Sequence, residues 1–292
     1  MDNMTAKVSC FARAYHHKQN TTHIFDDSVA AAILMDDYDE IAMNMTAGVN
    51  FFMPDFKGTK EEGLRLIVDK QLSPSVLARS AYCEGKLLRE KEKDCKQYIV
   101  FAAGYDTFAL RNTDDARKVF ELDLPELLED KKARIQKAGL QEKAIYVPCN
   151  LAKDTWKAQL TNAGFHKNRK AFGSLLGISY YLTKEEFNHL LSHISEMLTE
   201  GSTLCFDYPF DEESYETKTN RALASGAGEQ MKALYSKQEI QCLLEKCGFT
   251  LEEHLSHDEM TAAYFAKYNE ANPNHPMEAP AGVHYVFARK HI

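Results

Sequence analysis

The chain has 292 residues, of which 44% are hydrophobic, 27% charged and 11% aromatic, and this composition is typical of a globular protein rather than a disordered or fibrous one. Its formal net charge of −8 argues against a nucleic-acid-binding protein, which would normally present a basic face. No apolar stretch approaches the ~18 residues needed to span a bilayer, and polar residues interrupt the N-terminus, so we expect neither a membrane segment nor a signal peptide.

The N-terminal part of the chain, up to about Tyr82, reads as helical and irregular, without a clear strand pattern. Within it, Asp26 or Asp27 can cap the helix that follows by accepting hydrogen bonds from its first amides. We expect residues 1–82 to form a helical cap that belongs to the same domain as residues 83–292.

After the cap, strand-like and helix-like segments alternate. The strand-like runs cover 98–103, 118–123, 144–149, 171–179 and 202–207. The helical patterns cover 107–111, 125–138, 155–163 and 184–198. Thr183 with Glu186, and Ser236 with Glu239, each match a capping box and so predict helix starts. Apolar runs that alternate with helices predict an α/β fold, in which a mostly parallel sheet carries helices on both faces.

The C-terminal part departs from this alternation. Two further strand-like runs, 249–254 and 283–289, have no helix of comparable strength between them. We therefore predict a seven-stranded sheet whose terminal strand pairs antiparallel at the sheet edge. Residues 211–235 form a polar insertion after a strand end, where a lid over an active site would lie, and a surface excursion explains this segment equally well.

One pair of strand ends carries a ligand-binding pattern. The first run ends in Ala102, Ala103 and Gly104, and the next run ends in Glu121 and Asp123. Asp123 lies 19 positions after Gly104, close to the roughly 20 that separate a nucleotide-binding turn from the acid that holds a ribose. Because Ala102 stands where a full GxGxxG would have its first glycine, an ordinary βαβ connection explains the turn equally well.

Together, these features resemble the leucine carboxyl methyltransferase-like family of class I S-adenosylmethionine-dependent methyltransferases, including its bacterial O-methyltransferase branch. The resemblance covers roughly residues 11–290. The segments that carry it are ARAY at 12–15, IFDD at 24–27, ARSAY at 78–82, AGYDTFALR at 103–111 and VFELDLP at 119–125. It implies a Rossmann-like class I fold and S-adenosyl-L-methionine as the cofactor.

The resemblance also implies roles for individual residues. Arg79 would pair with the methionine carboxylate of the cofactor, which its planar guanidinium suits. Ala102 and Gly104 would let the backbone lie against the cofactor. Asp123 would bind the ribose hydroxyls, with Glu121 as a second candidate at the same strand end.

Two positions depart from the family pattern. Asn150, which with Leu151 would flank the adenine, replaces the usual aspartate and can still accept a hydrogen bond, but without a charge. Leu176 stands where a glutamate usually precedes Gly177. The loss of that carboxylate weakens the transfer of a protein-carboxyl-methylating role and favours a different substrate.

The sequence therefore predicts a cytoplasmic S-adenosylmethionine-dependent methyltransferase that methylates a hydroxyl or carboxylate oxygen of a small molecule. The residues that we expect to contact the substrate are Tyr180, Tyr181, Tyr208 and Arg221, and no catalytic residue is assigned. The alternatives are a protein C-terminal carboxyl methyltransferase, a non-catalytic cofactor-binding protein on the same fold, and a dinucleotide-dependent oxidoreductase.

A metal site is not predicted. The seven cysteines are odd in number and lack CxxC spacing, which is typical of reduced, mostly buried thiols. His189 and His193 stand four positions apart in a helical pattern, a spacing compatible with a metal. The segment between them lacks the glutamate of HExxH, and no third ligand is evident from the sequence. We interpret the two histidines as exposed helix positions.

Overall fold

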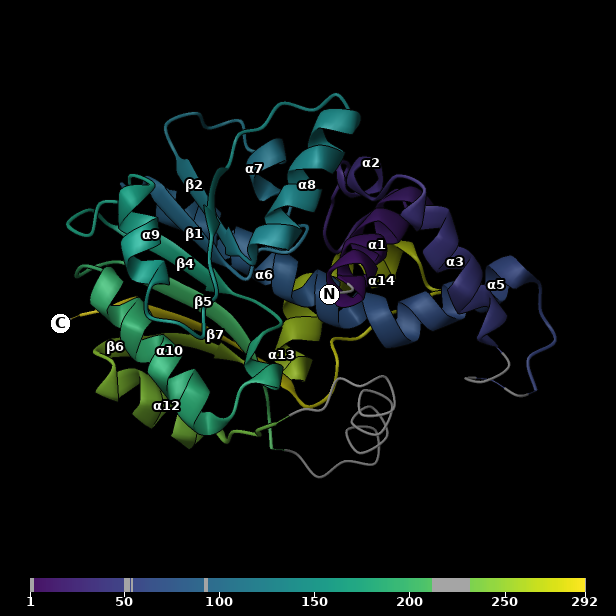
Figure 1. Cartoon of the computed structure of the whole chain (residues 1–292). Coiled ribbons are helices and arrows are strands. Elements are labelled where there is room, and N and C mark those ends of the chain that lie inside the picture. The colour runs from purple at the N-terminus through teal and green to yellow at the C-terminus, as the bar shows by residue number, and fades with distance from the viewer. Residues whose placement is uncertain (1–2, 50–52, 54, 92–93, 212–231, 292) are drawn as a thin grey trace.

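The computed structural model describes residues 3–49, 53, 55–91, 94–211 and 232–291. Its centre is one seven-stranded sheet in the order β3-β2-β1-β4-β5-β7-β6 (Figure 1). Strands β1 to β5 pair parallel, and β7 pairs antiparallel with both β5 and β6. The strands are β1 (Gln97–Phe101), β2 (Lys118–Asp123), β3 (Ile145–Pro148), β4 (Ala171–Leu175), β5 (Thr203–Pro209), β6 (Phe249–Leu255) and β7 (Val283–Lys290).

This topology confirms the predicted mostly parallel sheet and its antiparallel terminal strand. The expected edge position of that strand is wrong, because β7 lies between β5 and β6 and β6 forms the edge. Burial explains the exchange: nearly every residue of β7 is buried, whereas much of β6 remains partly exposed. The more apolar strand thus occupies the interior position. Strand β4 is also shorter than expected and ends at Leu175.

The helices flank the sheet and form the N-terminal cap (Figure 1). The α-helices are α1 (Met4–Gln19), α2 (Ala30–Leu34), α3 (Asp37–Ala47), α5 (Lys60–Ile67), α6 (Ser73–Lys91), α7 (Phe108–Arg111), α8 (Pro125–Lys137), α9 (Trp156–Asn162), α10 (Lys184–Met197), α12 (Lys237–Lys246), α13 (His257–Met260) and α14 (Ala266–Ala271). Shorter elements are the π-helical turns η1 (Val68–Leu72) and η3 (Thr261–Phe265) and the 3₁₀ turn η2 (Ser179–Tyr181). In the described part of the chain, no helix is both long and apolar enough to cross a membrane.

The helix starts follow from local chemistry. Thr183 and Ser236 both accept from the backbone amide three residues later, and the glutamates at those positions bond back to the cap amides. Both predicted capping boxes are therefore confirmed. Such reciprocal bonds satisfy amides that have no partner within the helix.

Each face of the sheet has its own apolar core. One core joins the strands to α9, α10 and α12, with Trp156, Phe187 and Ile240 buried in it. The other joins the opposite face to α6 and to the segment before β7, with Tyr82 and Phe265 buried. The parallel strands are thus covered on both sides, as their near-continuous apolar sequences require.

The N-terminal cap has a third core. Phe11 of α1 and Ile33 of α2 pack in one cluster with Ile135 of α8 and with Tyr105, which lies in the turn after β1. The cap therefore covers the carboxyl end of β1. Helix α6 runs without a break through the expected boundary at residue 82.

Candidate functional site

The turn after β1 has a tight backbone. Ala102 and Gly104 adopt positive φ angles of 53° and 51°, a conformation that glycine tolerates and that is uncommon for alanine. A Cβ placed on Gly104 would lie 3.4 Å from the Cβ of Ala6 in α1. Small side chains therefore leave the backbone of this turn open to close approach by a ligand. Helix α1 of the N-terminal cap lies next to the turn.

Asp123, at the end of β2, is bonded to this turn. Its Oδ2 accepts from the Gly104 amide at 2.7 Å, and its Oδ1 accepts from the Leu124 amide at 2.7 Å. Burial raises the pKa of Asp123, although both amide hydrogen bonds counteract this by favouring the ionised form. Each carboxylate oxygen has a second lone pair that can accept from a ligand hydroxyl.

Glu121 is in a different environment from Asp123. It is 1% exposed, and its Oε2 lies 2.5 Å from Nζ of Lys131, which is equally buried in α8. Burial raises the pKa of Glu121 to about 7, against the opposing charge of Lys131. The carboxylate is therefore engaged within the fold, beneath the strand end.

Asn150 and Leu151 follow β3 in the neighbouring turn. The side chain of Asn150 is exposed, and its Oδ1 accepts from the Ala152 amide at 2.9 Å. Leu151 is partly buried against the α10-side core. Since β3 adjoins β2, this turn lies beside Asp123, whose carbonyl accepts from the Cys149 amide at 2.8 Å.

Arg79, from α6, reaches the end of β4. A Cβ on Gly177 would lie 2.8 Å from Cζ of Arg79, so the guanidinium lies against the backbone of this glycine, which has φ +68°. Its polar contacts are long: 3.4 Å to Ser75 Oγ, 3.4 Å to Ser9 Oγ and 3.9 Å to Asp207 Oδ2. A guanidinium held at such distances can still bind a carboxylate at closer range.

Asp207 of β5 organises this end of the site. The side chain is completely buried; Oδ1 accepts from the Gly177 amide at 2.7 Å and Oδ2 accepts from the Tyr180 hydroxyl at 2.8 Å. Burial, with the nearby Asp207 charge, raises the pKa of Tyr180 well above its ordinary value. Asp207 thereby fixes Tyr180 and the glycine turn beside Arg79.

The structure separates the other expected substrate residues. Tyr181 is adjacent to Tyr180, with ring centroids 6.4 Å apart. Tyr208 instead belongs to the core on the α10 face, whereas Tyr180 belongs to the core on the α6 face. The Tyr208 hydroxyl lies 2.8 Å from His254 Nε2. Arg221 and most of the proposed lid lie outside the described residues.

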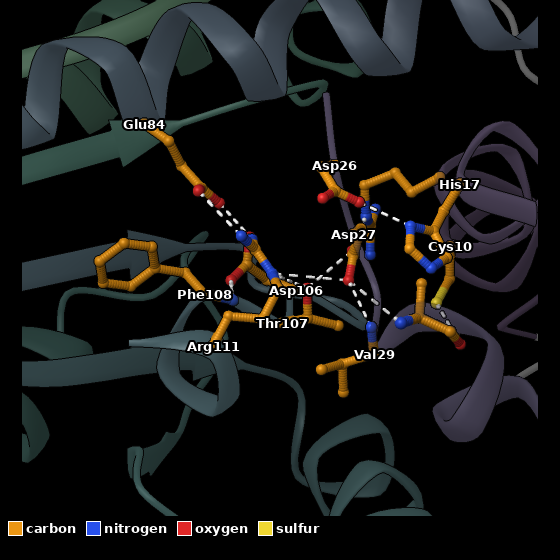
Figure 2. Close-up of polar contacts among 12 residues, drawn as sticks. Cys10, His17, Asp26, Asp27, Val29, Glu84, Asp106, Thr107, Phe108 and Arg111 are labelled. Atoms are coloured by element: carbon orange, nitrogen blue, oxygen red, sulfur yellow. Dashed lines mark hydrogen bonds and ion pairs between the residues drawn. The ribbon is translucent and has the colours of Figure 1, made fainter. Parts of the chain in front are cut away.

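Asp27 is a buried residue whose place at the site the sequence analysis missed (Figure 2). Its Oδ2 accepts from Arg13 Nε at 2.8 Å and from Thr107 Oγ1 at 2.7 Å. Its Oδ1 accepts from the amides of Val29 and Ala30, at 3.2 and 3.1 Å. Asp27, rather than its neighbour, thus accepts from the first amide of α2, whose N-cap residue is Val29, and it also ties the N-terminal cap to the turn after β1.

Two arginines extend this network. Arg13 Nη2 donates to the carbonyl of Tyr105 at 2.7 Å. Arg111 lies 3.5 Å from Asp27 Oδ1 and forms a bidentate pair with Glu84 of α6 (Figure 2). Burial raises the pKa of Glu84 to about 7, against the hydrogen bond and charge of Arg111. Buried charges therefore fix the positions of the N-terminal cap, the turn after β1 and α6 relative to one another.

The site residues span the carboxyl ends of four adjacent strands. In the order β3-β2-β1-β4, the strand ends carry Asn150, Asp123, the Gly104 turn and Gly177 with Arg79. The strand order reverses between β1 and β4, which is where open α/β sheets bind ligands. An acid on one side of this point and an arginine on the other suit a nucleoside that also carries a carboxylate.

Comparisons with known proteins identify a family and a similar protein. A family model described as leucine carboxyl methyltransferase matches residues 6–195. A protein of Bacillus subtilis (strain 168), YktD, which is named as an S-adenosyl-L-methionine-dependent methyltransferase, is 35% identical over 304 aligned residues, covering 99% of this chain and 98% of that protein.

Solved structures show the same fold at low identity. A DUF574 family protein from Streptomyces avermitilis matches with a TM-score of 0.61 and 13% identity, covering 97% of each chain. A magnesium protoporphyrin IX methyltransferase from Synechocystis PCC 6803 with bound SAH matches with a TM-score of 0.50 and 7% identity, over 88% of this chain and 98% of that one.

Proposed function

The chain belongs to the leucine carboxyl methyltransferase family, and from this premise we propose that it transfers a methyl group from S-adenosylmethionine to an oxygen atom of a small molecule. The observation that carries the proposal is the set of strand-end groups between Asp123 and Arg79. These groups match the two ends of the cofactor, a ribose diol and an amino-acid carboxylate.

The side chains and the turn at these strand ends suit the separate parts of the cofactor. Asp123 is fixed by two amides and keeps lone pairs for ribose hydroxyls. Arg79 would bind the carboxylate, and Ala102 and Gly104 would admit the nucleotide to the backbone. Asn150, with Leu151 beside it, would flank the adenine. Glu121 is left out of this proposal because Lys131 engages it within the core.

Methyl transfer from this cofactor needs little acid–base catalysis. When bound, the cofactor supplies an activated methyl group with a good leaving group, so the chain has to align the acceptor and exclude water. A carboxylate acceptor needs no base, whereas a hydroxyl acceptor can use one. The Tyr180 hydroxyl donates a hydrogen bond to Asp207 and retains acceptor lone pairs. We propose that Tyr180 orients the acceptor, with Tyr181 at its side.

The family description favours a second candidate, methylation of a protein C-terminal carboxylate. The substitution of leucine for the glutamate at position 176 weighs against it. Leu176 packs against the α6-side core. A panel of acceptors distinguishes the two: small hydroxyl and carboxyl compounds on one side, and a peptide with a free C-terminal leucine on the other, with S-adenosylhomocysteine release as the readout.

Titration calorimetry tests the cofactor site directly. S-Adenosylmethionine and S-adenosylhomocysteine should both bind, and NAD should give no heat. Asp123→Ala should weaken both affinities by about tenfold or more, because it removes charged hydrogen bonds worth roughly 1.5–3 kcal/mol. Asp115→Ala, an exposed acid in the preceding loop, is the matched control. If Asp123→Ala binds normally, another acid holds the ribose.

A further inference from the structure

A cluster of metal-ligand side chains lies outside the proposed cofactor site. His189 and His193 of α10 meet Asp154, which comes from the loop between β3 and α9. One ligand atom from each of the three residues lies within 4.8 Å of the others. Asp154 Oδ1 is 3.2 Å from His193 Nδ1 and 3.9 Å from His189 Nε2. The structure thus brings a third candidate ligand, which the sequence left unidentified, beside the two histidines.

The helix presents both histidines on one side. Residues four apart lie one above the other on a helix, and the two imidazole centroids are 4.0 Å apart with planes inclined at 59°. Helix α10 is anchored by its capping box and by buried Phe187 and Leu191. The histidine pair is therefore carried by a fixed support, and Asp154 faces it from a second element.

These distances are close to those in a metal site. Two ligands at about 2.0–2.1 Å from a tetrahedral zinc ion are about 3.3 Å apart, so small rotations of exposed side chains bring all three into range. His189 and Asp154 are 60% and 64% exposed, and His193 is 13% exposed. The ion would reach the site from solvent.

We propose that Asp154, His189 and His193 bind a divalent zinc ion at this surface. Two imidazole nitrogens and one carboxylate oxygen suit a borderline metal, and three protein ligands leave a position for water. The ion would tie α10 to the loop that carries Asn150. That loop is continuous with the site, since the Lys153 amide donates to the Asn150 carbonyl at 2.9 Å and Asp154 follows directly.

A second group, His17, His23 and Asp26, has a less suitable geometry. Its donor atoms also lie within 4.8 Å of one another. The two imidazoles stack with planes only 22° apart and centroids 5.3 Å apart. A metal ion lies near the plane of each ligating ring, and two nearly parallel, separated planes do not converge on one nearby point. This group serves as the competing site in the experiment.

Calorimetric titration of the full chain with zinc chloride, on protein without a polyhistidine tag, tests the proposal. We expect one site in the wild-type protein. His189→Ala, His193→Ala and Asp154→Ala should each lower its affinity by about tenfold or more. His275→Ala, which removes an exposed histidine far along the chain, is the matched control and should leave the affinity unchanged. Circular dichroism verifies that each variant is folded.

Three outcomes would overturn the proposal. The wild-type protein could fail to bind zinc, in which case Asp154 makes only ordinary polar contacts with the two histidines. Binding could persist unchanged in His189→Ala and His193→Ala. Binding could instead disappear in His23→Ala, which would assign the ion to the cap group.

Discussion

Replacing Asp27 by asparagine tests whether buried charge holds the N-terminal cap on the turn after β1. The substitution keeps the shape of the side chain and replaces one oxygen by an amino group. The contacts of both oxygens are with donors: Arg13 and Thr107 at Oδ2, and the amides of Val29 and Ala30 at Oδ1. Either orientation of the asparagine therefore sets its amino group against donor hydrogens.

The expected loss is large. Removing one partner of a buried ion pair costs about 3–5 kcal/mol, and Asp27 is completely buried beside Arg13. Domains typically unfold with about 5–15 kcal/mol, so Asp27→Asn should lower the urea midpoint markedly. Because the turn at Thr107 loses its tether, we also expect S-adenosylmethionine affinity to fall by about tenfold at temperatures where the variant is folded.

The pH dependence gives an independent check. Burial would raise the pKa of Asp27, but the charges of Arg13 and Arg111 and the hydrogen bonds from Thr107 and Arg13 outweigh it and hold the pKa below its ordinary value. The unfolded chain then binds more protons as pH falls. The contribution of Asp27 is therefore complete above an unfolded pKa of about 3.9 and is lost as pH falls through the lower folded value.

Urea titrations of the wild-type protein and two variants decide the matter. Asp26→Asn changes the neighbouring side chain, which is 61% exposed, and should alter the free energy of unfolding by no more than about 0.5 kcal/mol. The difference between wild type and Asp27→Asn should narrow below about pH 4. The reasoning fails if Asp27→Asn is as stable as Asp26→Asn, or if the difference persists unchanged in acid.

Two further substitutions have matched controls. Gly177→Ala should lower cofactor affinity by about tenfold, because its Cβ would displace the Arg79 guanidinium. Gly139 has the same φ of +68° with open space around it, so Gly139→Ala should share the backbone cost of about 1–2 kcal/mol and bind cofactor normally. Lys131→Met should destabilise by about 3–5 kcal/mol by leaving Glu121 unpaired, and Met at both positions should restore most of that loss. If this double variant loses cofactor affinity in calorimetry, Glu121 rather than Asp123 holds the ribose.

Much of the sheet could be predicted because its signals are local. Apolar runs, helical periods and the capping residues Thr183 and Ser236 act over a few positions, and the structure confirms them. The interior position of β7 depends instead on how its apolar character compares with that of β6, a strand distant in sequence. A pattern of apolar residues predicts that a strand exists, but the competition for the interior place is decided by total burial.

The site divides in the same way. The spacing between Gly104 and Asp123 predicted their proximity, since adjacent parallel strands bring their ends together. Glu121 is also a carboxylate and lies two residues before Asp123. Its buried ion pair with Lys131 is what separates its role from that of Asp123. The contact from Asp27 to Thr107 joins residues 80 apart, and Asp154, in a loop, contacts a histidine pair on α10. No local sequence pattern predicts such long-range contacts.

The leucine at position 176 changes the electrostatics of the site more than its architecture. Leu176 packs into the α6-side core, and the carboxylate close to Arg79 comes from the next strand, as Asp207. Asp207 also holds Gly177 and Tyr180, so the turn retains its support without a second acid. Compared with the glutamate that the family resemblance implies at position 176, leucine leaves one fewer negative charge at this end. An electron-rich acceptor oxygen then meets less repulsion, and a cationic acceptor gains less attraction. This charge balance supports the proposed methylation of oxygen, and the panel of acceptors distinguishes a hydroxyl from a carboxylate.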